Sequence, residues 1–223
     1  MVLKYPSPNP IFLIGTSGKG LEHLFNLAGS LPKGFPAPFV FLLHRIKKAN
    51  KNQQSIYELM KKKSQLDVHI AHDGMEFEPG NIYLPELGKH LLIKDGKAVL
   101  STEPDDSFWM PSIDKLFISA AQDYKSSTVS VLLSGGMEDG IDGLIETTHQ
   151  GGVTIAQSPE DAYNPILPLN ALIKDHPSYV LPLRDMPPLF CELIGMGCYP
   201  DQTDILHRAA EAAARRRKNP AAK

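Results

Sequence analysis

Residues 11–20, with the sequence IFLIGTSGKG, decide the fold class of this chain. The four apolar residues Ile11 to Ile14 predict a short strand that is buried on both faces, as in a parallel sheet. A glycine-rich turn follows at once, and from Leu21 onward apolar residues recur at helical spacing. A strand, a glycine-rich turn and a helix form the first unit of an α/β fold.

The same order of elements continues along the chain. Further apolar runs predict strands at 37–43, 129–133 and 153–156, and helical spacing predicts helices at 56–60, 111–124 and 141–150. This alternation predicts a doubly wound, mostly parallel sheet with helices on both faces and right-handed crossovers.

The middle of the chain has a different pattern. Short extended segments are expected at 67–71, 81–84 and 91–94, and Asp95-Gly96 is a strong hairpin signal before 98–100. We therefore expect a small antiparallel excursion from the parallel sheet in this region.

Length and composition favour one domain followed by a tail. The chain has 223 residues, 42% of them hydrophobic, and a formal net charge of −2, so no overall field favours nucleic acid or a membrane surface. No run of 18 apolar residues exists, and the N-terminus has no signal-peptide pattern, so we expect a cytoplasmic protein without membrane insertion. We expect a catalytic domain over 1–198, and a C-terminal helix, frayed, with a disordered basic tail over 199–223.

Cysteine and histidine patterns give little support for a metal site. Cys191 and Cys198 are too few for a disulfide framework and lack the partners of a zinc site, so we expect buried thiols. His69 and His72, with Asp73 nearby, point to opposite faces if they lie on a strand, and they are expected at the surface. The sequence predicts no metal and no organic cofactor.

Three polar side chains follow predicted strands closely. Ser17 lies just after the first strand, His44 ends the second, and Asp139 lies in the glycine-rich turn after the strand at 129–133. Because the functional crevice of an open α/β sheet lies at the carboxyl ends of its strands, we expect these groups to meet there. A nucleophile, a base and an orienting carboxylate are the set that acyl transfer requires.

The glycines near Ser17 have a mechanical role in this hypothesis. A tight turn between strand and helix exposes the nucleophile, and the N–H groups around Gly18, Lys19 and Gly20 can meet the oxyanion that forms on attack. Gly136, in the second glycine-rich turn, could bring another backbone N–H to the same place.

A phosphate-binding turn is the rival interpretation of residues 15–20. The P-loop pattern requires Ser or Thr after its lysine, where this chain has Gly20, and the dinucleotide fingerprint requires a different order of glycines. An anion site at the start of the helix stays open.

Several motifs, taken in this order and at these spacings, resemble one known family. They are Ile14-Gly15-Thr16-Ser17, the strand that ends in His44, Pro79 to Leu84 followed by His90, Pro111 to Phe117, Leu133 to Gly140, and Gly151 to Gln157. The family is the catalytic domain of the protein-glutamate methylesterase of bacterial chemotaxis. The resemblance implies a doubly wound α/β domain that hydrolyses γ-glutamyl methyl esters on chemoreceptors and in some members deamidates glutamines. It implies that Ser17 is the nucleophile, that His44 is the base and that Asp139 is the orienting carboxylate.

The chain departs from the family pattern close to the nucleophile. Gly18 and Lys19 replace a threonine and a glycine, Arg45-Ile46 follows His44 in place of Met-Pro, and Met110 replaces an arginine. In the oxyanion loop, Gly136-Met137 replaces the family's Met-Gly. These changes affect the oxyanion hole and the edge of the substrate site. The candidate oxyanion or substrate-binding residues of this chain are Gly18, Lys19, Gly136 and Met137. We expect no receiver domain before this domain and no control by phosphorylation within the chain.

The sequence thus predicts a serine hydrolase that acts on a methylated chemoreceptor or a similar protein. Lys19 and Met110 keep open a second hypothesis, a catalytically weakened binding or regulatory module in a chemotaxis-like pathway. A small-molecule esterase or deamidase is a third hypothesis. The oligomeric state and the identity of the substrate protein do not follow from the sequence.

Overall fold

A parallel sheet of seven strands forms the centre of the computed structural model, which describes residues 3–44, 53–102, 110–197 and 204–218. The strand order is β3-β4-β2-β1-β7-β8-β9, and every neighbouring pair is parallel. The strands are β1 (Ile11–Ser17), β2 (Phe39–His44), β3 (Asp67–Ile70), β4 (Asn81–Leu84), β7 (Thr128–Leu132), β8 (Val153–Gln157) and β9 (Tyr179–Leu181).

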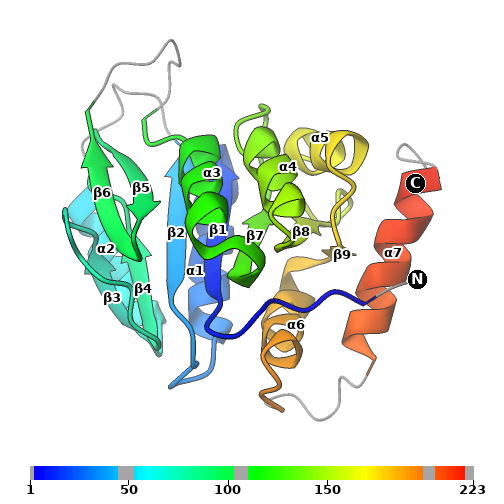
Figure 1. Cartoon of the computed structure of the whole chain (residues 1–223), viewed down its shortest axis with the longest axis horizontal. Coiled ribbons are helices and arrows are strands. Elements are labelled where there is room, and N and C mark those ends of the chain that lie inside the picture. Colours follow the sequence, from blue (N-terminus) through cyan, green and yellow to red (C-terminus); the bar gives the residue numbers. More distant parts are fainter. Residues whose placement is uncertain (1–2, 45–52, 103–109, 198–203, 219–223) are drawn as a thin grey trace.

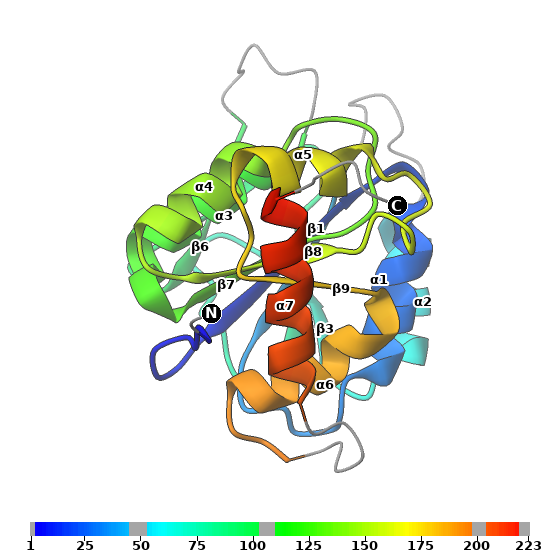
Figure 2. The same cartoon turned by 90° about the vertical axis from the view of Figure 1, so that its right-hand side faces the viewer.

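Helices cover both faces of this sheet, as Figures 1 and 2 show. The helices are α1 (Leu21–Ser30), α2 (Gln53–Lys63), α3 (Ile113–Tyr124), α4 (Ile141–His149), α5 (Ile166–Lys174), α6 (Met186–Leu193) and α7 (Ile205–Lys218), with short 3-10 turns η1 (Gly18–Gly20), η2 (Lys125–Ser127) and η3 (Leu183–Asp185). Side chains alternate along β1: Phe12 and Ile14 pack with α1 and α6, whereas Ile11 and Leu13 pack with α3, α4 and α5. The predicted doubly wound α/β fold is confirmed.

The path of the chain creates a crevice beside β1. From β1 it moves to β2, β3 and β4 on one side, and then it returns to place β7, β8 and β9 on the other side. Such a reversal separates the connections that leave the carboxyl ends of adjacent strands, here β1 and β7. The carboxyl end of β1, near the top of Figure 1, is thus the expected place for a site.

The antiparallel excursion is smaller than the sequence predicts. Among the described strands, β5 (His90–Lys94) and β6 (Lys97–Ser101) pair in this way, through a turn at Asp95 and Gly96 in which both residues have positive φ, and Glu76 adds one antiparallel bridge to Lys97. The segments at 67–70 and 81–84 are instead parallel strands of the main sheet, with β3 at its edge and β4 between β3 and β2. The prediction failed there because a short strand has the same pattern in a parallel and in an antiparallel pair.

The helix α7 packs more closely than the frayed helix that the sequence suggests. Ile205, Leu206, Ala209 and Ala210 are buried in the core shared with α6 and β9. Figure 2 shows α7 crossing in front of the β9 edge of the sheet. The predicted boundary at 198 and residues 199–203 and 219–223 of the predicted tail lie outside the described residues, whereas its basic residues 215–218 belong to α7.

The cysteine prediction is wrong for Cys191. This residue is buried at the end of α6, as expected, but it forms a disulfide and is not a free thiol. The positive φ of Gly195 turns the chain just beyond α6, which allows it to fold back toward the helix. Cys198, the other cysteine of the sequence, lies outside the described residues.

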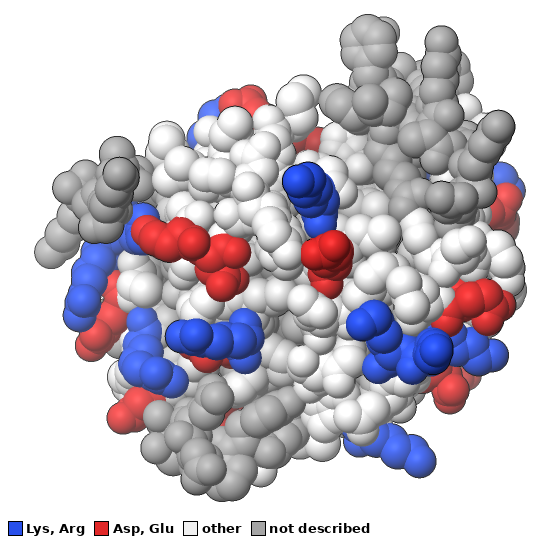
Figure 3. Space-filling view, turned by 180° about the vertical axis from the view of Figure 1, so that it is seen from behind, with Lys and Arg blue, Asp and Glu red and all other residues white. Residues whose placement is uncertain are grey.

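Charges are dispersed over the surface. On the face that Figure 3 shows, acidic and basic side chains alternate with wide uncharged areas, in agreement with the small net charge. Within the described residues, none of the helices combines the length and the apolar character that crossing a membrane requires.

Candidate functional site

Ser17 and His44 lie side by side at the carboxyl ends of β1 and β2. The parallel register pairs the two residues directly, so their Cα atoms are cross-strand neighbours. Adjacent strands lie about 4.8 Å apart, and paired residues of a parallel ladder project to the same face. The sheet itself thus brings the predicted nucleophile and the predicted base together.

Asp139 reaches the imidazole of His44 from the turn after β7. The His44 Nδ1 atom lies 3.2 Å from the Asp139 Oδ2 atom, and the His44 side chain is buried. Burial lowers the pKa of His44, and the nearby Asp139 charge opposes this shift. A neutral imidazole whose Nδ1 is held by a carboxylate can accept a proton at Nε2, as a general base requires.

The Asp139 carboxylate also caps the start of α3. Its Oδ1 accepts from the Ser112 hydroxyl at 2.8 Å and from the Asp114 N–H at 3.1 Å, and its Oδ2 accepts from the Ile113 N–H at 2.8 Å. The first turn of a helix presents unpaired N–H groups and a partial positive charge, which favour a carboxylate there. These bonds fix the carboxylate in the position from which it meets His44.

Glycines allow the close packing that this arrangement requires. Gly140, which precedes α4, has φ of 105°, and a Cβ atom there would come within 2.8 Å of Ile113 and 2.7 Å of Leu132. At Gly15 a Cβ atom would lie 2.6 Å from Ile113. A side chain at either position would push α3, and with it the carboxylate site, away from the strand ends.

The second glycine-rich turn lies against the nucleophile. The Ser17 N–H donates to the Ser134 carbonyl at 3.1 Å, and the Gly136 N–H donates to the Ser17 Oγ atom at 3.3 Å. A Cβ atom on Gly135 would approach the same Oγ atom to 2.8 Å. A backbone N–H beside the attacking oxygen is a candidate donor to the oxyanion that forms next to that oxygen.

The other predicted oxyanion and substrate residues lie around Ser17 without a comparable contact. Gly18 has φ of 60°, and Lys19 is exposed on η1, where it forms no ion pair with the described residues. The Met137 side chain is 49% exposed. Met110 is buried, and Arg45 lies outside the described residues.

Sequence reasoning missed Asp114, a carboxyl group next to Asp139. Its N–H donates to the Asp139 Oδ1 atom at 3.1 Å, and its carboxyl group accepts from the Gly143 N–H at 2.8 Å. Burial, followed by the charge of Asp139, raises the pKa of Asp114 to about 7. The only sequence signal was the position of Asp114 within the Pro111 to Phe117 motif.

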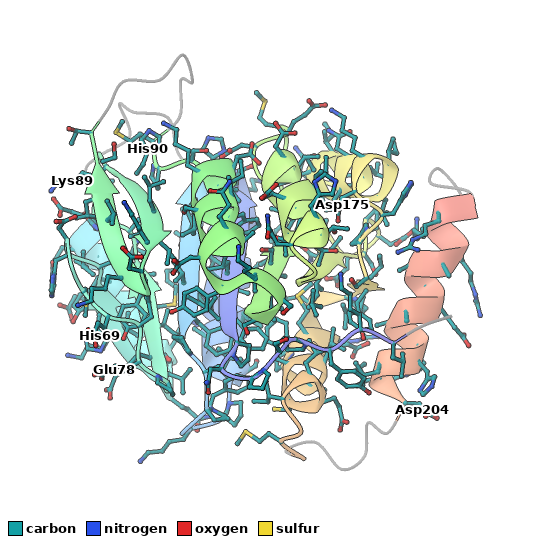
Figure 4. The ribbon with its side chains drawn as sticks, viewed as in Figure 1. His69, Glu78, Lys89, His90, Asp175 and Asp204 are labelled. Atoms are coloured by element: carbon teal, nitrogen blue, oxygen red, sulfur yellow. The ribbon has the colours of Figure 1, made fainter. Side chains whose placement is uncertain are left out.

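The histidines considered as metal ligands lie away from this site. Figure 4 shows His69 and Glu78 at the β3 and β4 side of the molecule, and the His69 Nε2 atom bonds the Asn81 side chain at 2.8 Å. His72 is exposed. Within the described residues, His, Cys, Asp and Glu side chains form no group of three that could hold a metal ion.

A cleft of about 650 Å³ opens beside the carboxylate. Ser112, Gly136 and Asp139 line one part of it, and Met137 and Ile166 form an apolar part of its rim. Lys174, at the end of α5, pairs with Glu138 at 2.9 Å across the rim. The cleft therefore offers apolar contacts directly beside the oxyanion loop.

Comparisons with known proteins identify one family. The family model described as CheB methylesterase matches residues 12–190. A protein-glutamate methylesterase/protein-glutamine glutaminase of Thermotoga maritima is 32% identical over 188 residues, which cover 82% of this chain and 54% of that protein. A putative protein of the same name from Leptospira interrogans is 29% identical over 182 residues, which cover 81% of this chain and 93% of that protein.

A solved structure has the same fold. The crystal structure of the Thermotoga maritima CheB methylesterase catalytic domain matches with a TM-score of 0.76 and 31% sequence identity. The match covers 84% of this chain and 100% of that chain. This chain spans about half the length of the full Thermotoga relative and nearly all of the Leptospira relative.

Proposed function

Because the chain belongs to the CheB methylesterase family, we propose that it is a serine esterase that hydrolyses γ-glutamyl methyl esters on chemoreceptor-type proteins. One observation carries this proposal: β1 and β2 place Ser17 beside His44, and Asp139 holds the Nδ1 atom of His44 at 3.2 Å. A serine, a buried neutral imidazole and an orienting carboxylate together are suited to acyl transfer.

The first half of the reaction forms an acyl-enzyme. His44 Nε2 takes the hydroxyl proton of Ser17 as the Ser17 oxygen bonds to the ester carbonyl carbon. The Gly136 N–H, already 3.3 Å from the Ser17 Oγ atom, lies where it can stabilise the oxyanion. The bond to the methoxy group then breaks, and methanol leaves with the proton from His44.

The second half restores the enzyme. A water molecule gives a proton to His44 and attacks the acyl carbon, and Ser17 leaves with that proton, so the product is a free glutamate side chain. A glutamine side chain would follow the same steps with ammonia as the leaving group. The name of the Thermotoga relative includes the glutaminase activity.

The surface around Ser17 supports a protein as the substrate. Met137 and Ile166 are each about half exposed, at 49% and 48%, and both line the cleft beside Gly136 and Asp139. Exposed apolar side chains gathered in one place are typical of surfaces that bind other proteins. A partner is therefore expected to contact this rim while its ester reaches Ser17.

Methanol release from a methylated chemoreceptor fragment tests the proposal. The parent protein should release methanol, and Ser17→Ala, His44→Ala and Asp139→Ala should each lower the turnover by roughly 10⁴-fold or more, with losses that do not add. Circular dichroism of each variant checks that the fold is retained.

A fluorophosphonate probe separates catalysis from binding alone. Labelling of Ser17 requires an activated serine, so the parent should be labelled and His44→Ala should not. If the parent binds the methylated fragment but neither reacts with the probe nor releases methanol, the chain is a binding module and the esterase proposal is wrong.

A further inference from the structure

Asn164 lies against the loop that faces the nucleophile. It comes from the connection between β8 and α5, and its backbone bonds this loop twice: the Gly135 N–H donates to its carbonyl at 3.1 Å, and its N–H donates to the Ser134 Oγ atom at 2.8 Å. A Cβ atom on Gly136 would lie 2.8 Å from the Asn164 Nδ2 atom. The side-chain amide thus occupies the space directly beside Gly136.

The orientation of this amide follows from its acceptor. The Asn164 Oδ1 atom accepts from the Ile166 N–H at 3.1 Å, at the start of α5, so the atom beside Gly136 is the donor Nδ2. Within the part of the chain that the structure describes, no hydrogen bond engages Nδ2. The side chain is half-buried, and it holds its two N–H groups next to the N–H that already contacts Ser17.

Several hydrogen-bond donors together stabilise an oxyanion better than one donor does. As the Ser17 oxygen bonds to the carbonyl carbon, the electron pair of the C=O bond moves onto the carbonyl oxygen and the hydroxyl proton goes to His44. The Gly136 N–H, which contacts the Ser17 Oγ atom, is one backbone candidate for that oxygen, and the N–H groups around Gly18 are others, so a side-chain donor would add to them. Side-chain amides serve as such donors in acyl transfer.

We propose that the Asn164 side-chain amide is a catalytic oxyanion donor that acts together with the Gly136 N–H. This role rests on the proposed esterase function. It also gives the connection between β8 and α5 a direct part in the reaction. The sequence motifs point only to the loops after β1, β2 and β7.

Two substitutions distinguish a donor role of the Asn164 side chain from a purely structural role. Asn164→Asp keeps the size of the side chain and the acceptor for the Ile166 N–H, but it removes the donor. Asn164→Ala removes the donor without adding a charge. Asn26→Asp, on the exposed surface of α1, is the control for a new negative charge on an asparagine.

The experiment measures the rate at which a fluorophosphonate phosphonylates Ser17, because the phosphoryl oxygen occupies the oxyanion position as fluoride leaves. Both Asn164 variants should lose about 10²- to 10³-fold in the maximal labelling rate, with little change in the half-saturating probe concentration. Asn164→Asp should keep the parental melting midpoint, and Asn26→Asp should keep the parental rate.

Each other result overturns the donor role. A rate within threefold of the parent in Asn164→Ala shows that the amide donates nothing to the reaction. A loss in Asn164→Ala that Asn164→Asp does not share shows that the residue acts through the start of α5. A parent protein that is never labelled at Ser17 rejects the esterase function, and the donor role with it.

Discussion

Two carboxyl groups, those of Asp139 and Asp114, lie close together at the start of α3. The Asp139 Oδ2 atom lies 3.2 Å from the His44 Nδ1 atom, and the Asp139 carboxylate accepts from two N–H groups of the first turn of α3. Asp114 is largely buried beside it, and its pKa is raised to about 7. Below this pH, Asp114 is mostly protonated, and its neutral form limits the negative charge close to His44.

Removing the titratable group of Asp114 should change how stability depends on pH. Its pKa is raised from 3.8 to about 7, so the folded state binds more protons than the unfolded state between these values. The parent should accordingly lose stability as pH rises from about 4 to about 7. In the Asp114→Asn variant, the Gly143 N–H keeps its acceptor while this loss disappears.

Thermal melts at pH 4.5 and pH 8 measure this effect. The melting midpoint of Asp114→Asn minus that of the parent should be larger at pH 8 than at pH 4.5. Asp142→Asn removes an exposed carboxylate from the first turn of α4 and is the control. If the difference for Asp114→Asn is the same at both pH values, Asp114 does not titrate in this range.

A methyl group on Gly135 should disable the nucleophile without removing any chemical group. The new Cβ atom would lie 2.8 Å from the Ser17 Oγ atom and 2.6 Å from the Leu167 side chain, so the loop or the serine must move. A displacement on the order of 1 Å at a reacting group costs about 10²-fold in rate. Gly135→Ala should therefore slow phosphonylation of Ser17 by about this factor.

Gly197→Ala is the matched control for this prediction. A Cβ atom on Gly197 would meet nothing within 4 Å, and its φ is not positive. Equal labelling rates in Gly135→Ala, Gly197→Ala and the parent would contradict the close contact between the loop and the nucleophile.

Single residues differ in how well their roles follow from sequence. Ser17, His44 and Asp139 stand next to apolar strands, so the topology alone suggests that they converge. Asp114 and Asn164 lack such a signal. Asp114 is one helical residue of a capping turn, and Asn164 follows a tyrosine in an irregular connection, so only the packing of α3 and of residues 158–165 reveals their neighbours.

Among the elements, α3 connects folding most directly to the site. Its N-cap residue, Ser112, accepts from the Lys115 N–H at 3.3 Å and donates to the Asp139 carboxylate at 2.8 Å. The hydroxyl thus closes the first turn of the helix and also positions the carboxylate. The two roles are expected to fail together.

Ser112→Ala should lower both stability and rate. The loss of an N-cap serine costs about 1 kcal/mol of unfolding free energy, which urea unfolding measures. The labelling rate of Ser17 should fall as well, because the carboxylate loses a fixed donor. Ser112→Thr keeps the hydroxyl and should retain most of both quantities. A variant that loses stability but labels at the parental rate would show that the other bonds suffice to hold Asp139.

Apolar periodicity identified the central strands and several helices, and it failed elsewhere for two reasons. β1, β2, β7 and β8 are buried on both faces, so their sequences are mostly apolar. By contrast, α5 and α6 contain prolines, at 168 and at 187 and 188, which obscure a helical pattern. The direction in which β3 and β4 pair depends on their partners, which only the tertiary structure supplies.

At the scale of the whole molecule, α7 extends the domain past its family. The family match ends at residue 190, whereas Ile205, Leu206 and Ala209 belong to the same core as α6 and β9. The helix covers the outer edge strand, which would otherwise expose unpaired backbone groups and invite association. The resemblance to the methylesterase family is confirmed, but it provided no information about this helix.

Shortening one buried side chain of α7 should destabilise the whole fold. Leu206 is buried in the shared core, so Leu206→Ala should lower the unfolding free energy by about 2–4 kcal/mol. His207→Ala, at the exposed neighbouring position, should have little effect. Urea unfolding followed by circular dichroism measures both. An unchanged midpoint in Leu206→Ala would mean that α7 is dispensable for the stability of the sheet.

The two duties of Asp139 affect how distant relatives can be interpreted. Three donors of the first turn of α3 depend on its carboxylate, whatever happens at Ser17. A descendant that abandoned catalysis could exchange its serine freely, yet selection for folding would still retain the aspartate. In a survey of divergent sequences, the aspartate is therefore a marker of ancestry, and the serine is the marker of surviving chemistry.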